Sequence, residues 1–114
     1  MKKIAFLLFF LTLNSAPSLA QFTGPSVAGQ ISTVNQISQL RLGSYVTLNG
    51  AIINHQRGDY FTFKDASGEI RIEIENSVWQ GREVSPETKV RILAEVDQGP
   101  SGRYLWVKSL EIVK

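Results

Sequence analysis

Apolar and polar residues alternate with a period of two through most of the chain after residue 44. The alternation is clearest from Glu69 to Glu75, where isoleucines occupy every second position between charged residues. This pattern is typical of a β-strand that buries one face and exposes the other. It predicts five strands, over residues 45–53, 60–63, 69–75, 89–97 and 104–113.

Breaks in the pattern separate these strands. Polar or glycine-rich residues predict turns at 55–59, 65–68 and 98–102. In the last strand, Ser109 indicates a shift in register, after which Leu110 and Ile112 point inward. The alternation therefore predicts not only the strands but also which residues of each strand face the core.

Two segments predict short helical turns. Residues 76–80 are too few for a full helix but can form a turn, with Asn76 or Ser77 as its cap. Residues 35–40 have apolar residues three apart behind Asn35, and Gly43 closes the turn. Neither segment changes the all-β character of the chain.

A sheet of five strands has two edges to protect, and closing the sheet into a barrel removes both. Gly50 lies inside the long first strand, where an isolated glycine indicates a bulge or a bend. The element order predicts an all-β, five-stranded Greek-key OB-fold barrel with one short helical element between strands three and four. A five-stranded open sandwich is the competing architecture. In a sandwich Trp79 would be an ordinary core residue instead of a plug at the lower end of the barrel.

Residues 1–20 have the organisation of a secretory signal peptide. Lys2 and Lys3 form a positive segment, and residues 4–13 form an apolar run that is too short to span a bilayer. Ser18 and Ala20 place small residues at the two positions that signal peptidase reads. We expect cleavage after Ala20. An uncleaved membrane anchor is the alternative, but no basic stop-transfer cluster follows the run.

The remainder of the chain is long enough for one domain. Residues 21–30 are rich in Gly, Ser and Pro, which predicts a flexible leader. We assign residues 31–114 to the OB-fold domain. After cleavage we expect no membrane contact and a monomer.

Removing the signal peptide changes the charge argument. The whole chain has 12 Lys and Arg against 10 Asp and Glu, a formal net charge of +2, and Lys2 and Lys3 account for the excess. The remaining domain is formally neutral, which supports neither nucleic acid nor an anionic lipid surface as a partner. The chain has no cysteine, so it has no disulfide, thiol nucleophile or thiolate metal site.

Five short stretches resemble a known family. They are residues 22–26 (FTGPS), 45–50 (YVTLNG), 63–68 (FKDASG), 79–81 (WQG) and 90–97 (VRILAEVD). In this order, and behind a signal peptide, they resemble the bacterial OB-fold (BOF) family of small periplasmic proteins, the YgiW/YdeI-type stress tolerance proteins. The resemblance implies a periplasmic, non-enzymatic OB-fold protein that is linked to envelope stress and binds a small ligand. It does not assign binding residues.

The OB-fold itself indicates where a ligand would bind. The usual site is the outer face of strands two and three, flanked by the turns after strands one and four. Strand parity places aromatic residues on both sides of a charged strip there. The predicted ligand-binding residues are Tyr60, Thr62, Arg71, Glu73, Tyr104 and Trp106, with His55, Arg57 and Arg103 in or beside the turns. Aromatic faces stack on sugar C–H groups, and Arg and Glu bind hydroxyls or carboxylates, which suits a sugar or peptidoglycan fragment. The competing interpretation is simple cross-strand packing that stabilises the sheet.

The sequence contains little that would support catalysis or metal binding. His55 is the only histidine, and the serines of the turns are explained by backbone geometry. Glu73 and Glu75 lie two apart on one strand face, where a pair of carboxylates could serve glycoside hydrolysis, but a solvated face is favoured. We expect no catalytic residue, no metal site and no cofactor. Nucleic acid is not expected, because the outer face of strand three is mostly acidic.

The sequence therefore predicts a periplasmic OB-fold binding protein of envelope stress tolerance that binds a sugar or peptidoglycan fragment. The alternative is a protein–protein interaction module that docks an envelope protein through the same face and has no small ligand. A small-ligand site should need Arg71 and Trp106 together. A docking face should spread over the turns and the leader.

Overall fold

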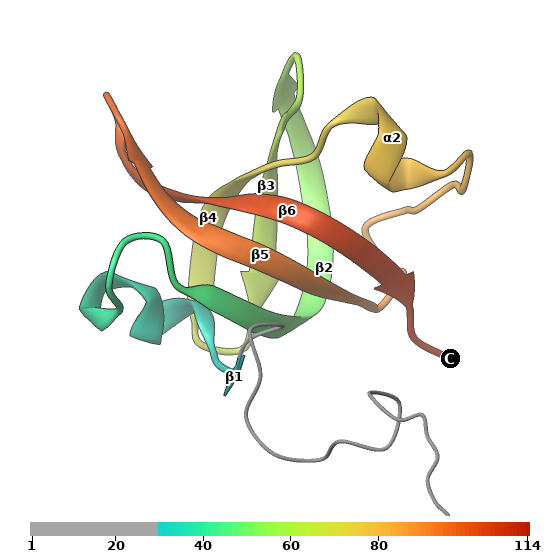
Figure 1. Cartoon of the computed structure of the whole chain (residues 1–114). Coiled ribbons are helices and arrows are strands. Elements are labelled where there is room, and N and C mark those ends of the chain that lie inside the picture. Colours follow the sequence, from blue (N-terminus) through green and yellow to red (C-terminus); the bar gives the residue numbers. More distant parts are fainter. Residues whose placement is uncertain (1–29) are drawn as a thin grey trace, which may run out of the picture.

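The computed structural model describes residues 30–114, and the expected signal peptide and residues 21–29 of the expected leader lie outside the described residues. The described strands are β1 (Gln30–Ile31), β2 (Tyr45–Arg57), β3 (Tyr60–Asp65), β4 (Gly68–Glu73), β5 (Val90–Gly99) and β6 (Gly102–Ile112) (Figure 1). The helices are the 3-10 helix η3 (Val34–Gln39) and the single-turn α2 (Asn76–Trp79). Gln30, expected in the leader, instead lies in β1 and pairs with Val46 of β2.

The five long strands form a closed barrel. β2 pairs with β3, β3 with β4, β4 with β6 and β6 with β5, and β5 pairs back with the first half of β2. The pairing of β4 with β6 is parallel, through Ile72 with Leu105 and Glu73 with Trp106. Closure of the sheet excludes the open sandwich and confirms the predicted OB-fold, with α2 between the third and fourth long strands.

β2 changes its partner strand at Gly50. Residues 45–50 pair with β5, and the strand from Ala51 onward pairs with β3. A Cβ atom at position 50 would overlap the carbonyl oxygen of Lys64 and lie 2.8 Å from Cζ of Phe63. Only glycine allows this close approach of the backbones. The structure thus confirms the predicted bend and gives its physical cause.

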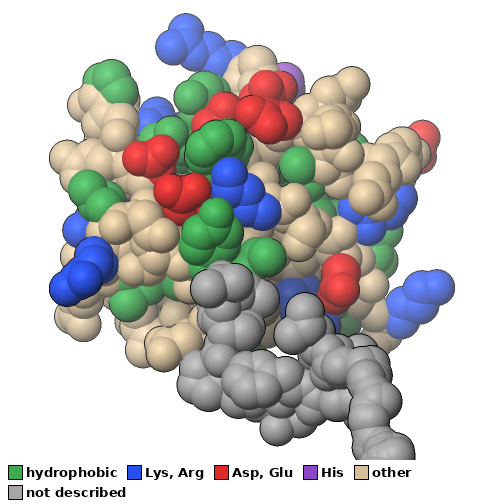
Figure 2. All heavy atoms as spheres, in the orientation of Figure 1, with side chains coloured by type: hydrophobic (Ala, Val, Ile, Leu, Met, Phe, Trp, Pro, Cys, Tyr) green, Lys and Arg blue, Asp and Glu red, His purple; other side chains and the backbone are tan. Residues whose placement is uncertain are grey.

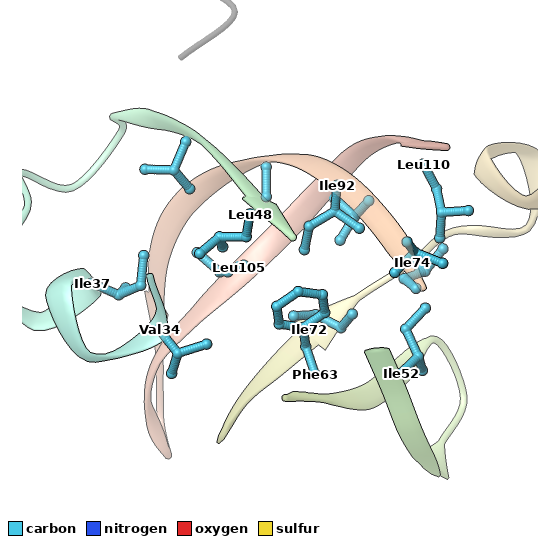
Figure 3. Close-up of a cluster of buried hydrophobic side chains, with 14 of the residues drawn as sticks. Val34, Ile37, Leu48, Ile52, Phe63, Ile72, Ile74, Ile92, Leu105 and Leu110 are labelled. Atoms are coloured by element: carbon cyan, nitrogen blue, oxygen red, sulfur yellow. The ribbon is translucent and has the colours of Figure 1, made fainter. Parts of the chain in front are cut away.

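One hydrophobic core fills the barrel, and its residues follow the predicted alternation (Figure 3). Val34 and Ile37 of η3 cover one end of the core, and Val78 and Trp79 of α2 pack against it as partly buried residues. Full burial of each large aliphatic side chain stabilises the fold by about 1.5–3 kcal/mol. The other buried residues are Val46, Leu48, Ile52, Phe63, Ile72, Ile74, Val90, Ile92, Ala94, Val96, Leu105, Val107 and Leu110.

β6 contains a bulge at Lys108. Val107 pairs with Ala94, while Ser109 pairs with the neighbouring Leu93, so that Lys108 is an extra residue in β6. The register shift expected at Ser109 is therefore present, with the extra residue immediately before it. The extra residue shifts the parity of the strand, so that Leu105 and Val107 before the bulge and Leu110 after it all face the core.

The turn between β2 and β3 is shorter than predicted. The sequence predicts a turn over residues 55–59, but His55 pairs with Phe61 and Arg57 pairs with Tyr60. These residues belong to β2, and only Gly58 and its neighbour form the turn. The polar composition that predicted a turn instead reflects the exposure of this end of β2.

The helices begin one or two residues earlier than predicted. The N-cap of η3 is Thr33 instead of Asn35, and the Thr33 N–H donates to Oε1 of Gln36 at 3.0 Å. The N-cap of α2 is Glu75 instead of one of the two residues after it. Within residues 30–114, no helix is long and apolar enough to cross a bilayer.

The β3–β4 hairpin fixes η3 to the barrel. The carboxylate of Asp65 accepts hydrogen bonds from the backbone N–H groups of Val34 (2.9 Å), Ser67 (2.8 Å) and Gly68 (3.2 Å). Burial raises the pKa of Asp65, but the hydrogen bonds from these residues outweigh burial and hold the pKa below its usual value. A second contact joins the Asn35 N–H to Oγ of Ser67 at 3.0 Å. These bonds satisfy N–H groups that a helix start leaves without intrahelical partners.

Candidate functional site

The outer faces of β3, β4 and β6 join into one surface. Tyr60 is paired with Glu73 and Thr62 with Arg71 across β3 and β4, and Glu73 is paired with Trp106 across β4 and β6. Cross-strand partners share a face of the sheet, so strand parity predicted this grouping correctly. We call the surface formed by Tyr60, Thr62, Arg71, Glu73, Tyr104 and Trp106 the outer-face site. Thr62, predicted to be exposed there, is instead buried, with 9% of its surface accessible. Figure 2 shows acidic and basic side chains among hydrophobic ones over β5 and β6.

Arg71 lies between two tyrosine rings at the centre of the outer-face site. Its Cζ atom is 5.3 Å from the ring centroid of Tyr60 and 5.6 Å from that of Tyr104, within the range of a cation–π interaction. The two rings meet edge to face, with their centroids 6.1 Å apart. Among residues 30–114 no carboxylate forms a salt bridge with Arg71, and its Nε is buried without a hydrogen-bond partner. The rings therefore hold a guanidinium whose charge is not paired.

A recess of about 320 Å³ lies beside Arg71. It lies between the β2–β3 turn and the β5–β6 turn, where the OB-fold predicts a ligand. Gly99, next to the lining residue Pro100, has no side chain to fill the space beside Arg71, where a Cβ atom would lie 3.8 Å from Nη2 of Arg71 and 3.5 Å from Cε1 of Tyr104. The volume is at the small end of the range for small-molecule pockets. The recess is lined by Gln56, Arg57, Tyr60, Arg71, Pro100 and Ser101.

Acidic residues adjoin the two tyrosines. The Oη of Tyr104 donates a hydrogen bond to Oδ2 of Asp97 at 3.2 Å. Burial, and then the hydrogen bond and charge of Asp97, raise the pKa of Tyr104 to about 12. Burial also raises the pKa of Glu73, and nearby carboxylates, Glu75 first, raise it further. The outer-face site therefore combines one central cation with carboxylates around it.

Lys108 covers one face of the Trp106 ring. Its Nζ lies 3.3 Å from the ring centroid and 3.7 Å from Oε1 of Glu95. Trp106 and Lys108 lie two residues apart in β6, on either side of the inward Val107, so strand alternation puts both side chains on the outside of the barrel. A ligand that stacks on this face of Trp106 must displace the lysine. The open part of the outer-face site is therefore the recess beside Arg71.

Of the three flanking residues predicted for the site, only Arg57 lines the recess. His55 stacks on Phe61, with ring centroids 4.7 Å apart, and its Nε2 lies 2.9 Å from the carbonyl oxygen of Gly58. Phe61 in turn meets Trp79 edge to face at 5.3 Å. His55 thus belongs to an aromatic cluster with Phe61 and Trp79, because β2 continues as a strand and turns the ring to the Phe61 side.

Arg103 is directed to η3 instead of the recess. Its Nη1 donates to the carbonyl oxygen of Ile37 at 3.1 Å and to that of Leu40. The Ile37 carbonyl also accepts from the Leu40 N–H at 3.1 Å, and a cationic side chain at the end of a helix interacts favourably with its last carbonyl groups. Arg103 therefore connects β6 to η3 and is not part of the outer-face site.

Sequence reasoning missed four residues that shape the site. Gln56 was expected in a turn, but its Nε2 donates to Oγ1 of Thr62 at 2.9 Å. Lys108 lies two residues after Trp106 on the same strand face, so strand parity could have found it. Asp97 is the cross-strand partner of Tyr104. Counting outward from the predicted turn at 98–102 would have found that pair. The fourth residue, Gly99, leaves space beside Arg71 and Tyr104, and this depends on contacts between strands that the sequence does not indicate.

Two larger recesses lie elsewhere on the described surface. One, of about 790 Å³, lies beside the bend of β2 and includes Ala51, Ile53 and Val113 in its walls. The other, of about 700 Å³, lies beside Phe61 and Trp79. Neither contains a charged group held between aromatic rings, so neither matches the chemistry of the outer-face site. Within residues 30–114 no three His, Cys, Asp or Glu side chains come together as a possible metal site.

A closed five-stranded barrel with this strand order defines the protein as an OB-fold protein, and comparison with known proteins gives the family. Residues 14–112 match the family described as bacterial OB fold (BOF) protein. The chain belongs to this family, as the short sequence stretches indicated.

Two relatives have similar lengths. The chain is 34% identical over 128 residues to Protein YgiW of Escherichia coli K12, and this alignment covers 99% of this chain and 98% of YgiW. It is 31% identical over 95 residues to the calcium-regulated OB-fold protein CarO of Pseudomonas aeruginosa, and this alignment covers 83% of this chain and 82% of CarO. The solved structure of the hypothetical protein YgiW from E. coli superposes with a TM-score of 0.71 at 37% identity, covering 81% of this chain and 97% of that one.

Proposed function

We propose that this protein is an exported, periplasmic OB-fold binding protein that acts in envelope stress tolerance. In this proposal it catalyses no reaction and binds a small ligand, such as a sugar or a peptidoglycan fragment, at the outer-face site. Membership of the BOF family supports an OB-fold protein of this kind. The location rests on the signal-peptide features of residues 1–20, above all the apolar run after Lys2 and Lys3.

The observation that carries the ligand proposal is the arrangement of Arg71 between Tyr60 and Tyr104 beside an open recess. An unpaired guanidinium is costly to bury, and fixing it between two rings restricts its motion. A ligand that pairs with the charge removes the cost of leaving it unpaired. Because the side chain is already held in place, little affinity is lost to ordering it when the ligand binds. Flat tyrosine faces next to polar groups are the features that sugar-binding surfaces need.

Ligand binding can be tested by titrating the purified protein with soluble peptidoglycan fragments while its tryptophan fluorescence is recorded. The protein has two tryptophans, Trp79 and Trp106. We expect a saturable change in the wild type and in Trp79→Phe, and its loss in Trp106→Phe, because Trp106 is the tryptophan that belongs to the outer-face site. Isothermal calorimetry of the same titration should give the same affinity. No heat and no fluorescence change, with circular dichroism showing an intact fold, would overturn the ligand proposal.

The proposed stress role is tested separately in the host cell. Deletion of the gene should increase sensitivity to an agent that damages the envelope, and the wild-type gene should restore tolerance. Complementation by Arg71→Gln should fail if tolerance depends on ligand binding. A deletion strain as tolerant as its parent to detergent, oxidant and acid would contradict the stress role without affecting the binding result.

A docking module of the envelope is the second candidate, and exposed apolar side chains favour it. Ile31 is 78% exposed, Leu42 48% and Tyr45 39%, and all three precede or begin β2. Large exposed apolar residues that lie near one another often mark a protein interface. In this case the double variant Ile31→Ser, Tyr45→Ser should lose a cross-linked envelope partner and keep sugar binding unchanged. An unchanged cross-linking pattern would argue against docking through this surface.

A further inference from the structure

Arg71 differs from the other well-placed arginines of the barrel. Arg91 donates to Glu111 at 3.2 Å and to Asn49 at 3.0 Å, and Arg103 donates to backbone carbonyl groups. Among residues 30–114, Arg71 has only the two tyrosine rings, and its buried Nε–H lacks an acceptor. Buried polar groups in native proteins are almost always hydrogen-bonded, so an exception needs an explanation.

We infer that the recess binds the carboxylate group of an acidic ligand and that Arg71 pairs with it. The inference deepens the proposed function and rests on the same outer-face site. The guanidinium presents planar N–H donors in a fixed fork that matches the two oxygens of a carboxylate. Gly99 leaves the Nη2 side of Arg71 open to the ligand. Arg57 is a second cation on the wall of the recess.

The surrounding carboxylates reduce the advantage that a second negative charge would give a ligand. Asp97 lies within hydrogen-bond distance of Tyr104, and Glu73 is the cross-strand partner of Tyr60, so both carboxylates adjoin the rings that hold Arg71. For a phosphate with two negative charges, both the repulsion by these groups and the attraction by Arg71 are about twice those for a carboxylate with one. The two carboxylates therefore offset part of what a second negative charge gains from Arg71.

The rest of the recess suits the uncharged part of such a ligand. Gln56 and Ser101 supply hydrogen-bonding groups, and Pro100 and Tyr60 supply apolar surface. This combination fits a sugar that carries an acidic substituent better than a neutral sugar, which would leave Arg71 unpaired. The ligand class is therefore an acidic sugar or a similar hydroxylated carboxylic acid.

Two matched sugars test the inference directly. N-acetylmuramic acid is N-acetylglucosamine with an added lactyl ether that carries a carboxylate. We expect calorimetry to give an affinity for the acidic sugar that is at least about tenfold higher than for the neutral sugar. The hydrogen bonds between its carboxylate and Arg71 contribute a binding free energy of that order. Arg71→Gln should abolish the preference. Arg91→Gln, which removes an arginine outside the recess, should keep it.

A second variant leaves Arg71 in place. Gly99→Val puts a side chain beside Nη2 of Arg71 and the Tyr104 ring, at ordinary contact distances for the first carbon. It should weaken binding of N-acetylmuramic acid about as much as Arg71→Gln, with an unchanged urea midpoint. Normal binding by a folded Gly99→Val protein would overturn the assignment of the carboxylate to this recess.

Acetate and inorganic phosphate separate failure of the inference from failure of the proposed function. In nuclear magnetic resonance titrations, acetate should shift the Arg71 resonances at a lower concentration than phosphate does. Equal affinity for the two sugars, unaffected by Arg71→Gln, would overturn the carboxylate inference and keep the sugar site. Acetate shifts without sugar binding would support the inference and remove the sugar proposal. No effect of sugar or acetate, or a stronger effect of phosphate, would overturn the inference.

Discussion

The backbone of Gly50 lies against the carbonyl oxygen of Lys64, at the point where β2 leaves β5 and joins β3. This approach allows one strand to serve both halves of the barrel. Closure then brings β6 beside β4, so that Trp106 becomes a neighbour of Glu73. The outer-face site thus depends on a glycine that takes no part in it.

Gly50→Ala should destabilise the protein strongly. The added methyl group would overlap the Lys64 carbonyl and press on the ring of Phe63, which is fully buried. Overpacking of this kind costs about 1–3 kcal/mol, and here backbone is involved. Urea unfolding followed by circular dichroism measures the loss. Gly99→Ala is the matched control, because its Cβ would sit at ordinary contact distance, and equal midpoints for the two variants would contradict the close approach.

Ile72→Ala and Glu73→Ala test the parity of β4. Ile72 is fully buried, so its truncation should lower the free energy of unfolding by about 2–5 kcal/mol. Glu73 lies on the outer face, and its removal should change stability by no more than about 0.5 kcal/mol. Thermal and urea unfolding of both variants check the difference. Similar losses would show that the two faces of β4 are assigned wrongly.

Asp65→Asn should make stability less dependent on acid pH. The pKa of Asp65 is lower in the folded protein than that of a free aspartate. Its carboxylate therefore stabilises the fold above that value, and the stabilisation is lost as the pH falls through the folded-state pKa. We expect the variant to be less stable than wild type at neutral pH, with the difference shrinking below about pH 4. Glu69→Gln, an exposed carboxyl on the same hairpin, controls for the loss of one charge. A difference that stays constant with pH would refute this role.

Tyr104 should ionise about two pH units later than a free tyrosine. Its pKa is raised to about 12, first by burial and then by Asp97. An ultraviolet absorbance titration should therefore contain a late phenolate step that Tyr104→Phe removes. Asp97→Asn should move this step to lower pH, because a neutral amide no longer opposes the phenolate charge. An unmoved step in Asp97→Asn would mean that burial alone raises the pKa.

The sequence predicted the strands, the barrel and most of the outer-face site for one reason. A strand has a period of two, so alternation by itself assigns Tyr60, Arg71 and Trp106 to one face and Ile72 to the other. The isolated Gly50 in a long strand added the bend, and with it barrel closure. The family stretches agreed with the same fold.

The errors in placing predicted site residues arose where pairing between strands or packing between elements set the partner of a side chain. His55 and Arg103 have the composition of site residues, yet His55 stacks on Phe61, and Arg103 reaches carbonyl groups of η3 that are 63 and 66 residues away. The Lys108 contact with Trp106 was missed even though the two residues are two apart and share a strand face. The contacts of His55 and Arg103 leave no periodic trace in the sequence.

By itself the sequence determined the family, the five long strands and the face of the barrel on which most of the candidate site lies, because each follows from local patterning. Only the tertiary structure decided that Arg71 stands between Tyr60 and Tyr104 with no paired carboxylate and that the recess is open beside Gly99. Periodicity assigns a residue to a face of its own strand. The partners of that residue depend on how the closed sheet brings β3, β4, β5 and β6 together.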